Sequence, residues 1–266
     1  MKTLKSELRS IRKRFRELLA RTIERQNINV VTVPISQCRH YCAFKYGSRS
    51  FNPYENYVVG LHEGTPLGEL RQRFEDFLIY FRPRNFGEVF DIELSRHIPL
   101  WVWPWSLGRC FNPNNGWLDD LDEVPDIITH FCEQGIKRSR IEEEYCWLER
   151  AYATVSTQGY QPHDNSFIEA LEFAKGNERV YLLEDGNHRI SALAALGHEE
   201  VMIKILGSLR WDGENHRKWP QVRLGTYSEQ DVIKLFNVYF VGVSGFRRSN
   251  QPAKIIEETL LSQVHR

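Results

Sequence analysis

The sequence has no long apolar run and no excess of charge of either sign. Its 266 residues include 35 basic and 35 acidic side chains, which gives a formal net charge of zero. Proteins that bind nucleic acids usually carry a basic excess, so this balance argues against such a partner. No stretch approaches the roughly 20 apolar residues of a membrane-spanning helix, and the N-terminus lacks the apolar core of a signal peptide. We therefore expect a soluble, cytoplasmic protein.

Cysteine is sparse and odd in number. The five cysteines are Cys38, Cys42, Cys110, Cys132 and Cys146. Their scatter suits a reducing compartment better than a framework of disulfides. Cys38 and Cys42 flank His40, but this C-x-x-x-C spacing has no second cysteine pair nearby. We therefore expect no zinc site there.

The most informative stretch of the sequence is Val180–Gly197. Four apolar residues predict a short strand at Val180–Leu183, and a polar turn follows at Glu184–Arg189. Small residues then predict a helix at Ile190–Leu196. Gly186 allows a sharp backbone turn where a Cβ would clash. The start of the helix presents unpaired N–H groups and a partial positive charge, which together favour an anion.

The side chains of this turn are chemically versatile. Arg189 can bind a phosphate or carboxylate with two N–H groups, and His188 can donate, accept or transfer a proton. Asp185 can bind a metal ion or accept a proton. Each residue alone is more often structural, as a turn residue, a surface ion pair or a packed ring. Their conjunction on one strand-to-helix turn favours a phosphate or nucleotide site.

The run Asp185-Gly186-Asn187-His188-Arg189, followed by Ser191-Ala192-Leu193 and Leu196-Gly197, resembles the nucleotide-binding signature of the ParB/sulfiredoxin-like superfamily. That superfamily includes CTP-binding partition proteins, ATP-using sulfiredoxins and an ADP-dependent kinase for free serine. The resemblance extends over Glu142–Leu206 and is closest to the D-G-x-H-R motif of the serine-kinase branch. It implies a small sheet with helices around a nucleotide.

The resemblance also implies roles for individual residues. The phosphates of ATP or ADP are expected to bind to Gly186, Asn187, His188, Arg189 and Ser191. Asp185 and His188 are expected to be catalytic, with Asp185 binding Mg²⁺ or orienting the attacking hydroxyl. In the serine-kinase branch an upstream glutamate lies across the pocket from the turn and acts as the base. We assign that position to Glu144.

Three activities within the superfamily can be weighed against the sequence. A sulfiredoxin needs a cysteine inside the turn, where this sequence has Asn187, so that activity is excluded. A ParB-like DNA-partition protein needs a basic helix-turn-helix region after the core, and the residues after Leu206 offer none. We therefore predict a small-molecule kinase that phosphorylates a hydroxyl of a sugar, polyol or amino acid. The alternatives are a nucleotide-binding regulatory module without turnover and a DNA-associated protein or nuclease.

Two segments before residue 135, one rich in tryptophan and one with two arginines, are candidates for the site that binds the phosphoryl acceptor. Ile98–Ser106 holds three tryptophans and two prolines, which exclude a regular helix or a central strand. The segment either wraps over the core or forms a platform on which a sugar or a base stacks. The run from Phe81 to Asn85 places two arginines around a proline, where they bind an anion or balance a helix end. This half is also similar to proteins of bacterial surface-polysaccharide clusters. The residues assigned to the acceptor are Arg82, Arg84, Trp103 and Trp105.

The whole chain is expected to form an α+β (mixed α/β) protein. We divide it into a basic amphipathic helix at 1–28, a family-specific region at 29–134, a ParB/sulfiredoxin-like core at 135–208 and a helical extension at 209–266. The apolar stripe of the first helix either packs on the protein or lies on an anionic membrane surface.

Periodicity places most other elements. Helices are expected at Leu67–Tyr80, Ile141–Thr157, Ser228–Tyr239 and Ala253–Val264, and strands at Val30–Val33 and Val201–Leu206. Ser166–Ala174 fits a strand or a short helix. Tyr46–Gly64, rich in aromatic residues, glycine and asparagine, predicts loops and short strands. Residues 210–217 loosely repeat the motif and are expected to form a loop or a lid.

Overall fold

The computed structural model describes residues 29–47, 51–100, 102–105, 111–112, 116–117, 138–162 and 166–245. The helices expected at 1–28 and at Ala253–Val264 lie outside them.

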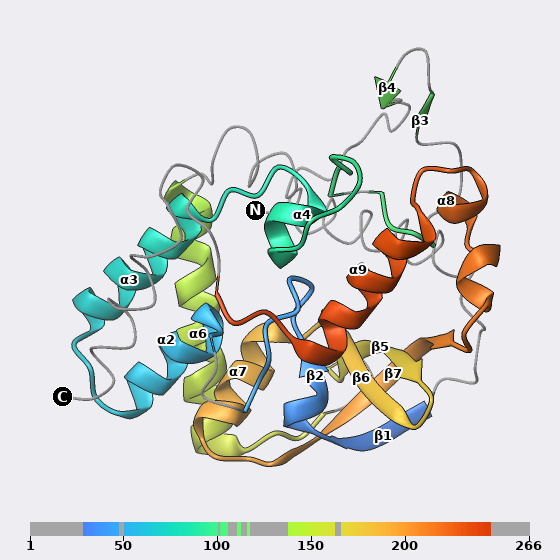
Figure 1. Ribbon diagram of the computed structural model, residues 1–266. Coiled ribbons are helices and arrows are strands. Elements are labelled where there is room, and N and C mark those ends of the chain that lie inside the picture. The colour runs from blue at the N-terminus through green and yellow to red at the C-terminus, as the bar shows by residue number, and fades with distance from the viewer. Residues whose placement is uncertain are drawn as a thin grey trace.

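A five-stranded mixed sheet forms the centre of the molecule (Figure 1). Its strands, in spatial order, are β1 (Asn29–Pro34), β7 (Glu200–Trp211), β5 (Ile168–Lys175), β6 (Glu178–Asp185) and β2 (Cys38–Arg39). β5 pairs antiparallel with β6 and parallel with β7. β1 runs antiparallel to β7, and β2 runs parallel to β6. A separate two-stranded ribbon joins β3 (Phe111–Asn112) to β4 (Gly116–Trp117). The expected α+β class is confirmed.

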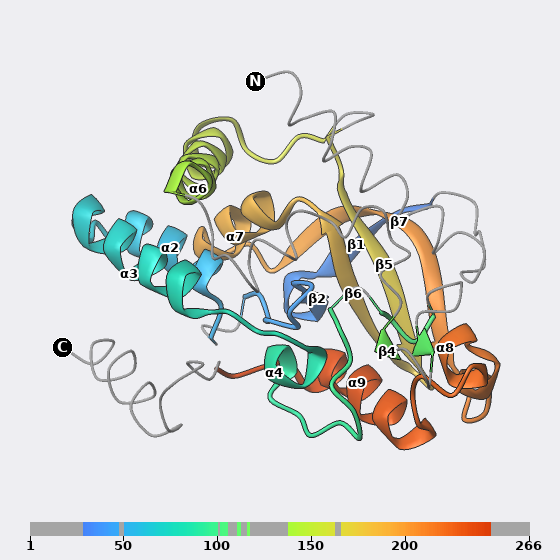
Figure 2. The same ribbon diagram turned by 90° about the horizontal axis from the view of Figure 1, so that it is seen from above.

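The helices gather in two groups (Figures 1 and 2). Toward one end lie α2 (Pro53–His62), α3 (Leu67–Tyr80), α6 (Arg138–Gln158) and α7 (Asn187–Ala195). Within this group α7 packs against both α2 and α6. Toward the other end lie α4 (Phe86–Phe90), α8 (Pro220–Arg223) and α9 (Glu229–Val241), together with the short 3-10 helix η3 (Asn215–Lys218). A second 3-10 helix, η1 (Ile35–Gln37), connects β1 to β2. None of the described helices is long and apolar enough to cross a lipid bilayer.

The expectation of loops and short strands at Tyr46–Gly64 was wrong, because α2 occupies the second half of that stretch. Asn52 caps the helix by accepting the backbone N–H groups of Tyr54 and Glu55, at 3.2 and 3.3 Å. Pro53 follows at the first helical position, where its missing N–H costs nothing. The start signal was therefore present in the sequence, but the aromatic content obscured it.

Other elements match the sequence pattern closely. The expected helix at Leu67–Tyr80 is α3, and those expected at Ile141–Thr157 and Ser228–Tyr239 are α6 and α9 with slightly different ends. Ser166–Ala174, left open between strand and helix, contains most of the central strand β5. Residues 210–217, expected to form a loop or a lid, instead form the end of β7, a short bend and the start of η3.

The tryptophans of Ile98–Ser106 that the structure describes lie in the core. Trp103 and Trp105 stack with ring centroids 5.2 Å apart and are 8% and 1% exposed. Trp105 also meets Phe173 of β5 edge-on at 5.4 Å, and Phe173 stacks on Phe236 of α9 at 5.3 Å. This aromatic cluster fastens α9 to the sheet. The burial favours core packing over a stacking platform for a ligand.

The front half of the chain shares its core with the later segments. β1 and β2 come from before the expected start of the nucleotide-binding core at residue 135, yet they pair with strands that follow it. The buried apolar side chains form one continuous cluster from Val33 to Val243. The region before residue 135 therefore completes the sheet.

Truncation of Trp105 to alanine should lower the free energy of unfolding by about 3–5 kcal/mol, because it empties the middle of the aromatic cluster. Arg84→Gln is the surface control: the Arg84 guanidinium is exposed, so its loss should leave the free energy of unfolding nearly unchanged. Urea denaturation measures both. A Trp105→Ala variant as stable as wild type would contradict the packing role.

Candidate functional site

The junction of β6 and α7 is the turn that the sequence singled out. Gly186 stands between them with φ of +95°, in the left-handed region that side chains with a Cβ disfavour. A Cβ at this position would also lie 2.6 Å from Cγ1 of Ile168. Among the described residues, no side chain caps the start of α7. The backbone N–H groups of its first turn are therefore available to an anion.

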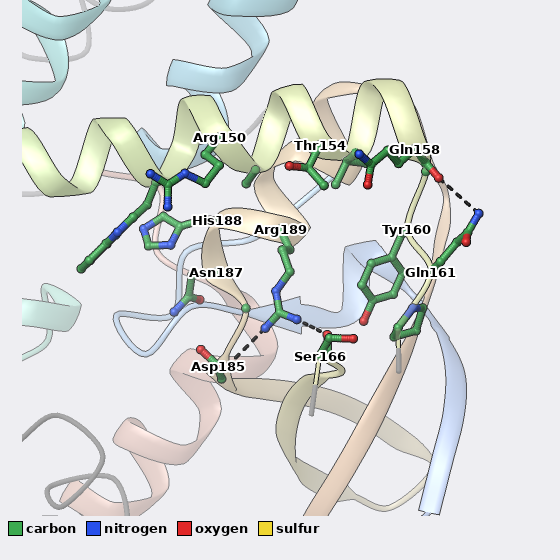
Figure 3. A pocket seen from close by; sticks show the side chains of 16 residues that line it. Arg150, Thr154, Gln158, Tyr160, Gln161, Ser166, Asp185, Asn187, His188 and Arg189 are labelled. Atoms are coloured by element: carbon green, nitrogen blue, oxygen red, sulfur yellow. Dashed lines mark hydrogen bonds and ion pairs between the residues drawn. The ribbon is translucent and has the colours of Figure 1, made fainter. Parts of the chain in front are cut away.

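A pocket of about 610 Å³ lies between this turn and α6 (Figure 3). Its walls come from one face of α6, from the chain that follows α6, and from the turn itself. The polar residues lining it are Arg150, Thr154, Gln158, Tyr160, Gln161, Ser166, Asp185, Asn187, His188 and Arg189. His188 and Arg150 lie toward one end, Tyr160 and Gln161 toward the other, and Arg189 lies between them.

Arg189 is held in place at the middle of the pocket. Its guanidinium donates to the carbonyl oxygen of Ser166 and pairs with the Asp185 carboxylate at 3.3 Å (Figure 3). Asp185 and Arg189 remain partly exposed, at 34% and 26% of their side chains. The guanidinium has five N–H groups, so these two contacts leave donors for a phosphate or carboxylate.

The imidazole of His188 contacts a buried carboxylate. Nε2 of His188 lies 2.9 Å from Oε2 of Glu144, and Arg140 donates to the other oxygen of Glu144 at 2.6 Å. Glu144 is 5% exposed. Burial alone would raise the pKa of Glu144, but the hydrogen bonds and charges of His188 and Arg140 outweigh it and hold that pKa below its ordinary value.

The ionised Glu144 determines which nitrogen of His188 carries the proton. A carboxylate has only acceptors, so Nε2 of His188 must donate to it. In the neutral ring, Nδ1 is then an acceptor that can take a proton from a bound hydroxyl. Glu144 itself does not line the pocket. The structure brings Glu144 to the turn, as the sequence suggested, but in contact with His188 and not facing the ligand.

Aromatic rings surround the Glu144–His188 pair. The ring centroid of Trp147 lies 5.5 Å from that of His188, and that of Tyr54 lies 6.3 Å away. The guanidinium of Arg140 stacks over Trp147 at 4.4 Å. These rings exclude water from one side of the imidazole, which strengthens its hydrogen bond to Glu144.

The remaining residues of the motif have different contacts. Asn187 lines the pocket, and its Oδ1 accepts the hydroxyl of the buried Tyr46 at 2.9 Å, which leaves the amide N–H groups as donors. Ser191 is fully buried and donates to the carbonyl of Asn187 at 2.8 Å. Ser191 therefore stabilises the first turn of α7 and does not line the pocket.

Asp185 by itself offers few ligand atoms to a metal ion. Within the described part of the chain, no group of three or more His, Cys, Asp or Glu residues is placed to hold a metal ion. Mg²⁺ commonly binds through one or two carboxylates, with phosphate oxygens and water completing its shell. A single partly exposed carboxylate fits that pattern only when a phosphorylated ligand is present.

The four residues assigned to the acceptor are not brought to this pocket. Arg84 pairs with Glu88 at 2.8 Å on the surface, and Arg82 donates to the carbonyl of Ile79 at 2.7 Å. Trp103 and Trp105 belong to the aromatic core described above. None of the four lines the pocket.

Several residues of the site were not predicted from the sequence. Trp147, Arg150, Thr154 and Gln158 recur at helical spacing on one face of α6, and this polar stripe was a usable signal. Tyr46 and Arg140 offered no such signal, because they reach the turn only through tertiary packing.

No family model, curated protein or solved structure matches the chain. The resemblance to the ParB/sulfiredoxin-like superfamily therefore rests on the motif alone.

Glu144→Gln should lower the free energy of unfolding at pH 7 by about 1–3 kcal/mol, because a buried amide N–H₂ replaces one acceptor between Arg140 and His188. The folded state holds the pKa of Glu144 below its ordinary 4.5, so its stabilisation is complete above that pH and is lost as pH falls below it. The deficit of the variant should therefore shrink below about pH 4.5.

Urea denaturation at several pH values measures this difference. Glu143→Gln is the matched control, because Glu143 is the neighbour on α6 and pairs with the same Arg140 from a more exposed position. An equal loss of stability in both variants, or a deficit of Glu144→Gln that does not depend on pH, would contradict the role of the buried carboxylate.

Proposed function

We propose that this protein is a nucleotide-dependent phosphotransferase of the ParB/sulfiredoxin-like type that transfers a phosphoryl group to a hydroxyl of a small molecule. The observation that carries the proposal is the pairing of His188 with a buried carboxylate at the uncapped start of α7, beside Arg189 in one pocket. Phosphoryl transfer requires positioned phosphates, neutralisation of their charge and a group that takes the proton of the hydroxyl.

The phosphate-binding part of the proposal rests on donors that converge. Arg189, the amide of Asn187 and the first backbone N–H groups of α7 all belong to the turn and helix start that line the pocket. The helix start adds a partial positive charge. In the structure, the Asp185 carboxylate pairs with Arg189. When the phosphates of ATP or ADP bring Mg²⁺ into the pocket, Asp185 binds the ion instead.

The catalytic part rests on His188. In the proposed step, Nδ1 of His188 takes the hydroxyl proton as the acceptor oxygen attacks the terminal phosphorus. The bond from that phosphorus to the bridging oxygen breaks, and the leaving phosphate keeps the electron pair. Glu144 stabilises the imidazolium that forms, as a carboxylate does for histidine in nucleophilic triads. Arg189 and the start of α7 stabilise the charge on the phosphoryl oxygens.

The two ends of the pocket suit different parts of the reactants. The end with His188 and Arg150 holds the proton acceptor, so the hydroxylated substrate belongs there. The end with Tyr160, Gln158 and Gln161 offers one ring and two amides, which can stack on a base and hydrogen-bond to its edge.

Nucleotide binding should raise the melting temperature of wild type but not of Arg189→Ala. A ligand at 100 times its dissociation constant stabilises the folded state by about 2.7 kcal/mol, which differential scanning fluorimetry detects. ATP, ADP, CTP and GTP are each compared with and without Mg²⁺. Arg179→Ala, at the far end of β6, is the matched control and should keep the full shift. No shift with any nucleotide in wild type would contradict the proposal.

His188→Gln should lower kcat by about 10²–10⁴-fold while nucleotide affinity changes little, because only the proton acceptor is lost. Product formation is measured by ³¹P NMR with sugars, polyols and amino acids as acceptors.

The same assay separates the alternatives. Nucleotide binding by wild type without product from any acceptor would favour a regulatory module. Binding to DNA with an affinity that falls steeply with salt would favour a DNA-associated protein.

A further inference from the structure

A second, smaller pocket lies at the opposite end of α7 from the phosphate-binding turn. It has a volume of about 330 Å³ and lies between α2 and the last residues of α7. The apolar part of its wall includes Val59 of α2 with Ala194 and Ala195 of α7. Its polar side chains are Glu55, His62 and Glu63. Nothing in the proposed phosphotransfer uses this pocket.

Glu55 is the most unusual side chain here. It is 3% exposed, and one of its oxygens accepts the backbone N–H of Gly47 at 3.0 Å. Among the described residues, no hydrogen bond reaches its other oxygen, which is not enclosed by protein and is open to the pocket. Burial raises the pKa of Glu55 to about 7, with the N–H of Gly47 opposing that rise. Since burial disfavours the ionised carboxylate, a positively charged donor from a ligand would stabilise it.

The charge around the pocket favours a cation. No lysine or arginine of the described chain lines it, whereas Glu55 and Glu63 both do. In addition, α2 ends at His62 and α7 ends at Ala195, so the C-terminal ends of two helices lie at the same pocket. Such ends carry a partial negative charge that stabilises cations.

The lining also limits what kind of cation fits. The described residues include no group of three His, Cys, Asp or Glu side chains placed to hold a metal ion. Val59, Ala194 and Ala195 instead offer an apolar wall to a short hydrocarbon. These observations point to an organic cation and not to a metal ion.

We propose that this pocket binds a small primary amine in its ammonium form, with the ammonium group paired to Glu55 and a short alkyl body packed on Val59, Ala194 and Ala195. The helix α7 then presents its N-terminal end to an anion and its C-terminal end to a cation. The assignment is independent of the phosphotransfer proposed above.

Isothermal titration calorimetry with propylamine and 1,4-diaminobutane tests the assignment, with 1-propanol as the neutral probe. The amines should bind wild type at pH 8, and about tenfold more weakly at pH 6, because Glu55 must be ionised to pair with them. At pH 7, titration in buffers of different ionisation enthalpy should show release of about half a proton per amine bound. Propanol should not compete.

Two variants locate the binding. Glu55→Gln keeps an acceptor for the N–H of Gly47 and should bind the amines about tenfold to hundredfold more weakly. The other titratable groups at the pocket are His62, Glu63 and the nearby Tyr46, and all three remain in this variant, so any pH dependence that it retains belongs to them. Ala195→Leu fills the pocket from the opposite wall and should also abolish binding, whether or not Glu55→Gln folds.

Arg189→Ala separates the two proposals, because it removes the phosphate-binding cation and should leave amine affinity unchanged. Amine binding that survives both Glu55→Gln and Ala195→Leu, or no amine binding by wild type at pH 8, would overturn the assignment.

Discussion

The buried carboxylate of Glu144 is the constraint on which the site depends. A carboxylate that is 5% exposed must be paired, and its two partners come from different elements: Arg140 from its own helix and His188 from the start of α7. The pairing therefore ties α6 to α7 and sets the width of the pocket between them. It also fixes the proton on Nε2 of His188, so one interaction serves both the packing and the proposed chemistry.

Helix α7 has a pocket at each of its two ends. It starts at a glycine that no other residue can replace without a clash at Ile168, and it packs between α2 and α6. Its N-terminal end lies at the large pocket and its C-terminal end at the small one. Because the peptide dipoles of a helix add along its axis, the two pockets are expected to favour ligands of opposite charge.

Local sequence signals predicted much of this arrangement. The apolar run, the glycine turn and the small-residue helix at Val180–Gly197 are local features, and the structure has each of them within a few residues.

The choice of Glu144 as a residue near the turn came from the family resemblance. Its contact with His188, and its absence from the pocket wall, depend on how α6 packs, which periodicity does not reveal. The segment of Trp103 and Trp105 was open to two interpretations, a wrap over the core or a stacking platform for a ligand, and burial against Phe173 favours the first. Tyr46, which orients Asn187 from 141 positions away, had no signal in the sequence.

In the proposed chemistry, a buried, ionised Glu144 holds the proton of His188 on Nε2 and leaves Nδ1 as the acceptor. Nitrogen-15 NMR of the His188 ring, assigned by comparison with His188→Gln, measures this directly in the neutral imidazole. The account predicts a protonated Nε2 and an unprotonated Nδ1 in wild type, and a mixture of tautomers in Glu144→Gln. A ring protonated on Nδ1 alone, or the same tautomer ratio in both proteins, would contradict it.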